Sequence, residues 1–211
     1  MKKITISMIG GVILYCLILM GGCSSSKLTD VWSDPAVQST SMHWVLVISV
    51  SKNSEQRRTW EDGFADELAK HNIAATPSYR LFPDGIPDSN QIMSIMRSHG
   101  FDGVLVTLWI PPDTRTQYLQ GYVTKKQDME YYRSTDRFAT YYRDIEHAGN
   151  INAQKIGFPS IDLWTTKYQG ELIWSASSKT SAANSTQAVR PEIVDHVISE
   201  LTQRGIIAPD R

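Results

Sequence analysis

The most constraining feature of the sequence is an unbroken run of mainly apolar and β-branched residues from His43 to Val50, HWVLVISV. A strand with one face in water carries polar residues at every second position, whereas a continuous apolar run is typical of a strand buried on both faces. Strands of this kind lie in the centre of a sheet that is covered by helices. The run therefore predicts an α/β architecture with residues 43–50 as its central strand.

Helical and extended patterns alternate after this run. Two helices and two strands are predicted, the helices at residues 54–71 and 88–100 and the strands at residues 73–78 and 101–109. Trp60, Phe64 and Leu68 recur at spacing four in the first helix, and Asp88 with Gln91 forms a helix-start pattern for the second. The resulting order, β-α-β-α-β, favours parallel strands joined by right-handed crossovers.

The last third of the chain predicts a hairpin. Two extended runs, residues 156–168 and 171–180, are separated by Gln169-Gly170, which is typical of an antiparallel turn. Alternation predicts two matching core-facing sets, Ile161, Leu163 and Thr165 in the first strand and Leu172, Trp174 and Ala176 in the second. This hairpin adds antiparallel strands to the parallel ones and so predicts a mixed sheet.

A helix near the carboxyl end completes the predicted domain. It begins near Pro191 and ends at Gly205. Its apolar residues share one helical face, and they are Ile193, Val194, Val197, Ile198 and Leu201. Together the elements predict one mixed-sheet α/β domain over residues 42–208, arranged as a two-layer or three-layer sandwich.

The first 22 residues predict a secretory signal peptide. Met1-Lys2-Lys3 is basic, residues 4–20 are apolar and Gly21-Gly22 is small, which is the order that export and cleavage require. The apolar stretch has 17 residues, fewer than the roughly 20 that a membrane-spanning helix needs. Cleavage is therefore favoured over an uncleaved anchor.

The segment Leu19-Met20-Gly21-Gly22-Cys23 resembles the lipobox of bacterial lipoproteins. This resemblance implies that Cys23 carries lipid and becomes the first residue of the mature chain, and Ser24 looks like an outer-membrane sorting residue. Two or three acyl chains at one site anchor a protein stably in a membrane. Residues 23–41 are polar and are predicted to tether the domain to the lipid, with part of the segment ordered, because Trp32 is expected to dock on the domain edge.

Composition and motifs argue against several classes of function. The 21 basic and 22 acidic residues are too balanced to predict a nucleic-acid surface. The five histidines show no metal-ligand spacing, and no nucleophile elbow, P-loop or dinucleotide-binding pattern occurs. Glu61-Asp62 and Asp66-Glu67 lie on the first predicted helix, where they are expected to face solvent. We therefore expect no metal, no cofactor and no enzymatic activity.

Residues 113–153 form a long insertion between the third strand and the hairpin, and six of the nine tyrosines lie between residues 118 and 142. One interpretation is a β-ribbon that is ordered by cross-strand tyrosine pairs. The other is a partner-binding surface, since tyrosine and arginine provide contact area and bidentate bonds. The two are compatible. The candidate partner-binding residues are Tyr118, Tyr122, Tyr131, Tyr132, Arg133, Tyr141, Tyr142 and Arg143.

The mature chain resembles a family of uncharacterised bacterial lipoproteins. The resemblance rests on a T-x-x-W-x-D-P segment at residues 29–35, on Arg57-Arg58 and Glu61-Asp62, and on Pro77-Ser78-Tyr79 and Leu172-Ile173-Trp174-Ser175. It implies an envelope location and an α/β layout that is similar to the amino-terminal domain of TolB, but no reaction. We expect a lipid-anchored, non-enzymatic interaction module on the periplasmic face of the outer membrane, contacting an envelope protein or the cell wall. The alternative is a lipoprotein that binds a glycan or small ligand through the insertion.

Overall fold

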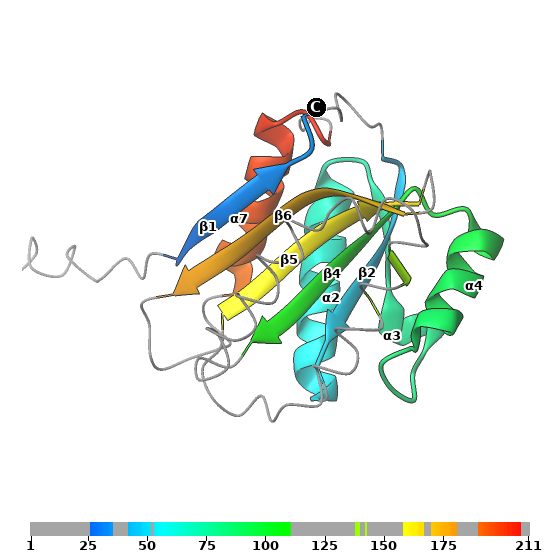
Figure 1. Cartoon of the computed structure of the whole chain (residues 1–211). Helices are drawn as coiled ribbons and strands as arrows, with labels where there is room; N and C mark the ends of the chain where they lie inside the picture. Colours follow the sequence, from blue (N-terminus) through cyan, green and yellow to red (C-terminus); the bar gives the residue numbers. More distant parts are fainter. Residues whose placement is uncertain are drawn as a thin grey trace, which may run out of the picture.

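The computed structural model describes residues 26–35, 42–51, 53–110, 138–139, 142, 158–166, 170–180 and 190–207. They form a six-stranded sheet with helices packed against it (Figure 1). The strands are β1 (Ser26–Ser33), β2 (Trp44–Val50), β3 (Ala74–Pro77), β4 (Gly103–Ile110), β5 (Phe158–Thr165) and β6 (Glu171–Thr180). The helices are α2 (Ser54–Lys70), α3 (Ser78–Leu81), α4 (Ser89–His99) and α7 (Arg190–Gln203).

The sheet is mixed, which confirms the predicted fold class. Its strand order is β1-β6-β5-β4-β2-β3. The strands β2, β3 and β4 are parallel, whereas β4, β5, β6 and β1 pair with one another antiparallel. The β-α-β-α-β order predicted for the first half and the hairpin predicted for the second are therefore both present.

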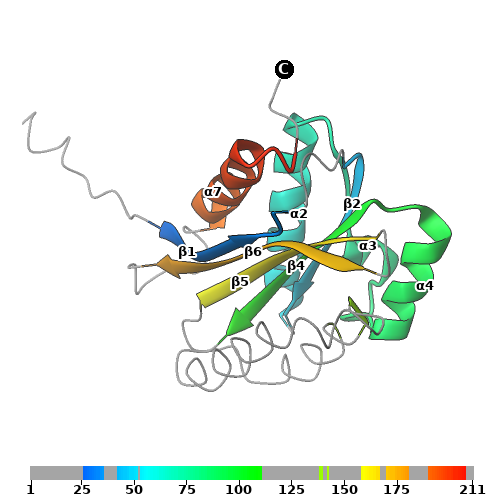
Figure 2. The same cartoon turned by 45° about the horizontal axis from the view of Figure 1, so that its top comes forward.

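One face of the sheet packs against α2 and α7. Figure 2 shows these two helices on the same side of the strands. Alternate residues of β2, including Val45 and Val47, contact Trp60 and Phe64 of α2 in one buried cluster. All five apolar residues predicted for the C-terminal helix face belong to this cluster as well, so the helix packs as its sequence pattern predicts.

The other face carries a second buried cluster. Its members come from the intervening positions of β2 and β4 and from Ile92 and Met96 of α4. Helix α4 begins at Asp88, which forms a capping box with Gln91, and ends at Gly100 in the left-handed conformation, with φ +74°. Both ends of this helix were predicted by the sequence pattern.

Part of the predicted tether is ordered, because Ser26–Ser33 form edge strand β1. The sheet therefore includes residues before 42, where the domain was predicted to begin. This strand pairs antiparallel with β6, and its register shifts between Thr29 and Trp32. The shift is a β-bulge, which breaks the regular alternation of side chains between the two faces of the sheet. Val31 therefore packs against the first cluster, and Trp32 packs against the second. The expected docking of Trp32 on the domain edge is confirmed.

The hairpin contains a second irregularity. Leu163 pairs with Trp174, but the register shifts between Leu163 and Trp164. Leu163 and Trp174 lie in the first cluster, as predicted, whereas Leu172 packs in the second cluster together with Trp164. The prediction that Leu172 shares a face with Trp174 is wrong, because a bulge breaks the alternation on which it rested.

The β-ribbon prediction is wrong for the residues of the insertion that the structure describes. Phe138, Ala139 and Tyr142 have helical backbone conformation. Phe138 and Tyr142 are fully buried and their ring centroids lie 5.7 Å apart. Their spacing of four places them on one side of a helical turn, and this side packs against Trp164 of β5, whose ring centroid is 5.6 Å from that of Phe138.

No helix among the described residues is long and apolar enough to cross a membrane.

Candidate functional site

The predicted site residues divide sharply between described and undescribed parts of the chain. Cys23 and seven of the eight insertion candidates lie outside the described residues. Those seven are Tyr118, Tyr122, Tyr131, Tyr132, Arg133, Tyr141 and Arg143. Only Tyr142 can be placed, and it is not a surface residue.

Tyr142 belongs to the core of the domain. Its side chain is fully buried in the second cluster, and its hydroxyl donates a hydrogen bond of 3.0 Å to the carbonyl oxygen of Pro87. The contact joins the insertion to the segment before α4, 55 residues away in sequence. The prediction of Tyr142 as a partner-binding residue is therefore wrong, because its ring and its hydroxyl are both used internally.

A buried polar network lies where the parallel strands β2 and β3 end. Arg57 and Glu61 of α2 form an ion pair in which Nε and Oε1 are 3.0 Å apart. Their residues are 4% and 0% exposed. Ser49 lies near the end of β2, and Ser78 follows β3 directly. Crevices at the carboxyl ends of parallel strands are the usual ligand sites of open α/β sheets, so this network is the first place to look for chemistry.

Both oxygens of the Glu61 carboxylate accept hydrogen bonds from neighbouring groups. Its Oε1 accepts hydrogen bonds from the backbone N–H of Ser49 at 3.0 Å and from the hydroxyl of Ser78 at 2.7 Å, in addition to the bond from Arg57. Its Oε2 accepts one from the backbone N–H of Tyr79 at 2.8 Å. A carboxylate with four donors around it is held in one orientation.

The guanidinium of Arg57 links three further groups. Its terminal nitrogens donate to the carbonyl oxygens of Phe82 and Gly85 and to the hydroxyl of Ser78. The ion pair thereby connects α2 with the end of β2, with α3 and with the loop before α4. Its donors and acceptors are directed at the protein itself, so the geometry assigns this network to the stability of the fold.

Glu61 corrects a second sequence expectation. The acidic pair Glu61-Asp62 was expected to face solvent, but Glu61 is completely buried and Asp62 is half-buried. The reason is helical geometry. Arg57 and Glu61 alternate with Trp60 and Phe64 along the same buried side of α2, so the charged pair lies within the packed face and must be neutralised there.

A smaller polar cluster adjoins the network at Tyr79. The hydroxyl of Tyr79 donates to Oδ1 of Asp62 at 2.8 Å, and the Cζ atoms of Arg58 and Arg80 lie 5.2 and 5.8 Å from the centroid of its ring. The hydrogen bond that Arg80 donates to the Tyr79 hydroxyl raises the pKa of Arg80. Stacks of this kind contribute modestly at exposed positions.

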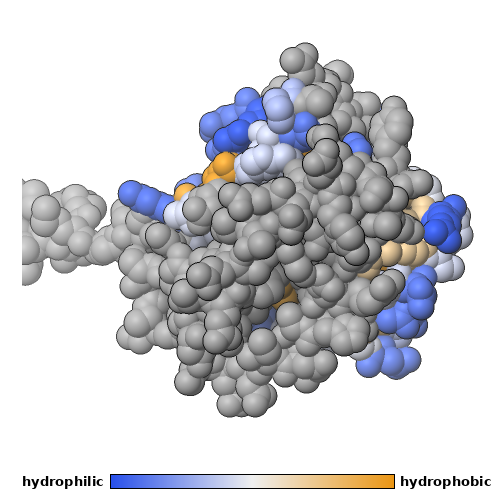
Figure 3. Space-filling model, in the orientation of Figure 1, coloured by the Kyte–Doolittle hydropathy of each residue, from blue (hydrophilic) through white to orange (hydrophobic). Residues whose placement is uncertain are grey.

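The side of the domain that carries α3 and α4 has a partly apolar surface. Six half-buried residues pack there against the second cluster, and they are Trp44, Leu81, Phe82, Ile86, Met93 and Ile95. Figure 3 shows pale apolar atoms at this end of the molecule, bordered by hydrophilic residues. The side chains are accessible without forming a deep cleft in the described part of the chain.

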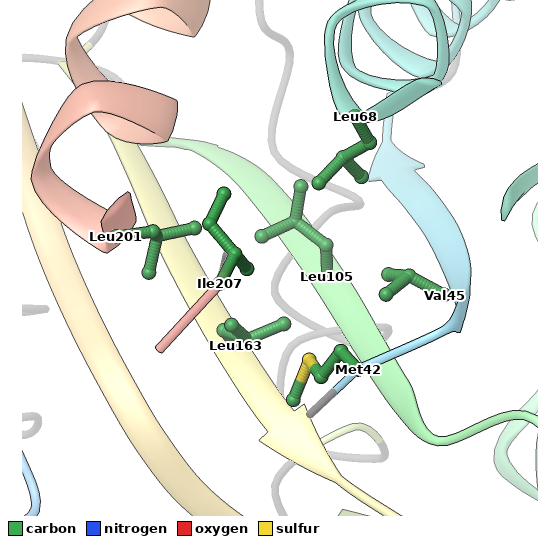
Figure 4. Close-up of a pocket in the computed structure, with 7 residues that line it drawn as sticks. All are labelled: Met42, Val45, Leu68, Leu105, Leu163, Leu201 and Ile207. Atoms are coloured by element: carbon green, nitrogen blue, oxygen red, sulfur yellow. The ribbon is translucent and has the colours of Figure 1, made fainter. Parts of the chain in front are cut away.

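A void between the sheet and its first helical layer is too small for a ligand. Its volume is about 10 Å³, and apolar residues of β2, α2, β4, β5 and α7 line it. Leu105 and Ile207 point toward each other across it in Figure 4. A water molecule needs at least about this volume and polar partners as well, so the void is a packing gap. Within the described ranges, no group of three or more His, Cys, Asp or Glu residues is arranged to hold a metal ion.

The mixed α/β sheet defines the structural class of the protein, but no protein-family model and no curated protein matches its sequence. A PelC dodecamer from Paraburkholderia phytofirmans is similar in fold, with a TM-score of 0.43 and 12% identity over 88% of this chain and 100% of that chain. A variant PelC dodecamer from the same organism has a TM-score of 0.42 and 14% identity, covering 83% and 96%.

Proposed function

We propose that the protein is a lipid-anchored component of the bacterial cell envelope that acts as a non-enzymatic interaction module. One observation carries the proposal, namely the order of basic, apolar and small residues that ends at Cys23. Lipid on Cys23 would hold the domain at the outer membrane, facing the periplasm. Acyl chains provide about 0.8 kcal/mol for each buried methylene, so two or three chains suffice without a membrane-spanning helix.

The structure supports a close attachment to the membrane. Strand β1 begins at Ser26, three residues after Cys23. Three residues span at most about 11 Å when fully extended. The first folded element is therefore held within roughly that distance of the lipid-bearing residue, and the domain does not hang from a long tether.

The tyrosine-rich insertion is the proposed contact surface. Phe138 and Tyr142 hold one part of it against the sheet, and Arg133, Tyr141 and Arg143 lie within five residues of these two along the chain. Tyrosine and arginine are the residue types that most often dominate the binding energy of protein interfaces. Tyr142 is removed from the proposed contact set, because its side chain is buried.

The anchor is tested by Cys23→Ser. We expect this variant to disappear from the membrane fraction and to lose labelling by a radioactive fatty acid, since serine has no thiol to acylate. Cys16→Ser is the matched control, because it changes the other cysteine within the apolar stretch that the signal peptidase removes. It should leave both readouts unchanged. Retention of Cys23→Ser on membranes, resistant to high salt, would contradict the proposed anchor.

The contact surface is tested with a triple variant, Tyr131→Ser, Tyr132→Ser and Arg133→Ser. Crosslinking in intact cells should recover one envelope protein with the unaltered chain but not with this variant, and the reverse pull-down should agree. The thermal midpoint of the variant should stay within a few degrees of the unaltered protein. Deleting residues 115–148 is a poorer test, because it also removes Phe138 and Tyr142 from the core. Equal recovery with both baits would refute the contact role.

A further inference from the structure

The short helix α3 and the outer side of α2 carry aromatic, basic and apolar side chains that solvent can reach. Two of these side chains are exposed arginines, one is a half-buried tyrosine and two are half-buried and apolar. We call this set the α3 surface, and its members are Arg58, Tyr79, Arg80, Leu81 and Phe82. Tyrosine and arginine are the residue types that most often dominate the binding energy of protein interfaces.

The backbone beneath the α3 surface is fixed by the buried ion pair. Glu61 accepts a hydrogen bond of 2.8 Å from the N–H of Tyr79. Arg57 donates one of 3.0 Å to the carbonyl oxygen of Phe82 and another to that of Gly85. Replacing a buried ion pair by apolar residues of similar volume is often neutral for stability. What this pair adds is a fixed conformation, and a segment that is already ordered loses little entropy on binding.

The two arginines of the α3 surface differ in how their charges are used. Arg80 donates a hydrogen bond to the Tyr79 hydroxyl, and its Nη2 lies 3.6 Å from Oδ1 of Asp62. The charge of Arg80 is therefore balanced within the protein. Arg58 lies over the Tyr79 ring, and within the described part of the chain it forms no hydrogen bond or ion pair. The ring thus positions the guanidinium of Arg58 while its N–H donors stay available.

A free guanidinium close to apolar side chains indicates the chemistry of its partner. The planar guanidinium matches a carboxylate, with which it forms two parallel hydrogen bonds. Leu81 and Phe82 follow the tyrosine and provide apolar contact area. We infer that the α3 surface binds a partner protein through a segment that carries an acidic side chain next to an apolar one. The inference rests on the proposed role as an interaction module, but not on the insertion as its contact surface.

The location of the α3 surface leaves it open to a second protein. Tyr79 and Arg80 follow β3, which is one edge of the sheet. Cys23 precedes β1, which is the opposite edge. A lipid on Cys23 would therefore attach the domain at the edge that lies away from the α3 surface.

The test measures the binding of short capped peptides to the mature protein, kept in solution by a nonionic detergent. One peptide alternates glutamate with leucine, and two others replace the glutamate by lysine or the leucine by serine. NMR signals of backbone amides and arginine Nε–H groups report the site. The glutamate–leucine peptide should shift the signals of Arg58 and of residues 79–82, and high salt should weaken its binding. The serine peptide should bind more weakly. Equal shifts with the lysine peptide would overturn the inference.

Substitution of Arg58 tests the carboxylate contact. Arg58→Gln should weaken binding of the glutamate–leucine peptide about fivefold, the effect of losing one exposed ion pair. Arg58→Lys keeps the charge but not the planar guanidinium, so its affinity should fall between the two. Lys27→Gln is the matched control, since it removes an exposed cation from β1 at the other edge of the sheet. Equal affinities of Arg58→Gln and Lys27→Gln would contradict the inference.

Two further measurements separate this inference from its alternatives. Inorganic phosphate is the other anion that a guanidinium binds well. A shift of the Arg58 signal by phosphate but not by the peptides would make the α3 surface a phosphate site and refute the inference. The triple variant of the insertion should bind the glutamate–leucine peptide as the unaltered chain does. Absence of peptide binding together with crosslinking that depends on the insertion would exclude the α3 surface and retain the proposed function.

Discussion

Replacing Glu61 by alanine is expected to lower the free energy of unfolding by about 3–5 kcal/mol, the range observed when one partner of a buried ion pair is removed. The variant leaves the guanidinium of Arg57, in a residue that is only 4% exposed, without its counter-charge. It also removes the acceptor of the N–H groups of Ser49 and Tyr79 and of the Ser78 hydroxyl. Urea denaturation followed by circular dichroism measures the change.

Two further variants make this test specific. Glu67→Ala removes the acidic partner of Lys70, whose side chain is 62% exposed, and exposed pairs of this kind contribute less than about 1 kcal/mol. Adding Arg57→Met to Glu61→Ala should recover part of the lost stability, since no charge is then left buried. A Glu61→Ala variant as stable as Glu67→Ala would show that water reaches the network.

The second large effect is expected at Tyr142. Truncation to alanine should lower the free energy of unfolding by about 3–5 kcal/mol, since it removes a fully buried aromatic ring from the second cluster. Tyr142→Phe keeps the ring and removes only the hydrogen bond to Pro87, so about 1 kcal/mol is expected. Chemical denaturation of the protein measures both changes in the free energy of unfolding.

The paired variants also separate a core role from a partner-binding role. If Tyr142 served mainly to contact a partner, the alanine variant would lose the partner while its unfolding transition stayed in place. Because Tyr142 is buried, we expect its truncation to lower the stability of the domain instead. Tyr142→Ala should unfold at lower denaturant concentration, whereas Tyr142→Phe should lose only about 1 kcal/mol and retain association.

Most of the secondary structure was predictable because it depends on local signals. The continuous apolar run of β2 marked the central strand, and the cap Asp88 accepts the predicted hydrogen bond from Gln91, three positions later. Gly100 ends α4 in the conformation that glycine adopts most easily. Each of these features involves residues within one or two turns of each other.

The features that were missed depend on contacts between distant segments or on interrupted periodicity. Strand β1 is short of apolar residues, and its bulge between Thr29 and Trp32 disrupts the alternation by which a strand is recognised. The burial of Glu61 depends on Ser78, which is 17 residues away. Its position beside Trp60 and Phe64 on the helix was a usable signal, since a wheel projection places all three on one side.

The candidate site was less predictable than the fold. The density of tyrosines in the insertion identified an unusual segment but could not distinguish packing residues from contact residues. For Tyr142 a local signal did exist, because Phe138 precedes it by four residues, the spacing of a helical face.

The pairing of β1 with β6 also determines when folding can finish. The side chain of Thr29 donates to the carbonyl oxygen of Ser177, 148 residues further along the chain. An edge strand that emerges first thus waits for a partner that is synthesised near the end, and closing so long a loop is entropically slow. Until β6 has been synthesised, the backbone of β1 has no strand to pair with. The β1 edge is therefore the last part of the sheet to form, and the growing chain leaves it open to other binding partners until then.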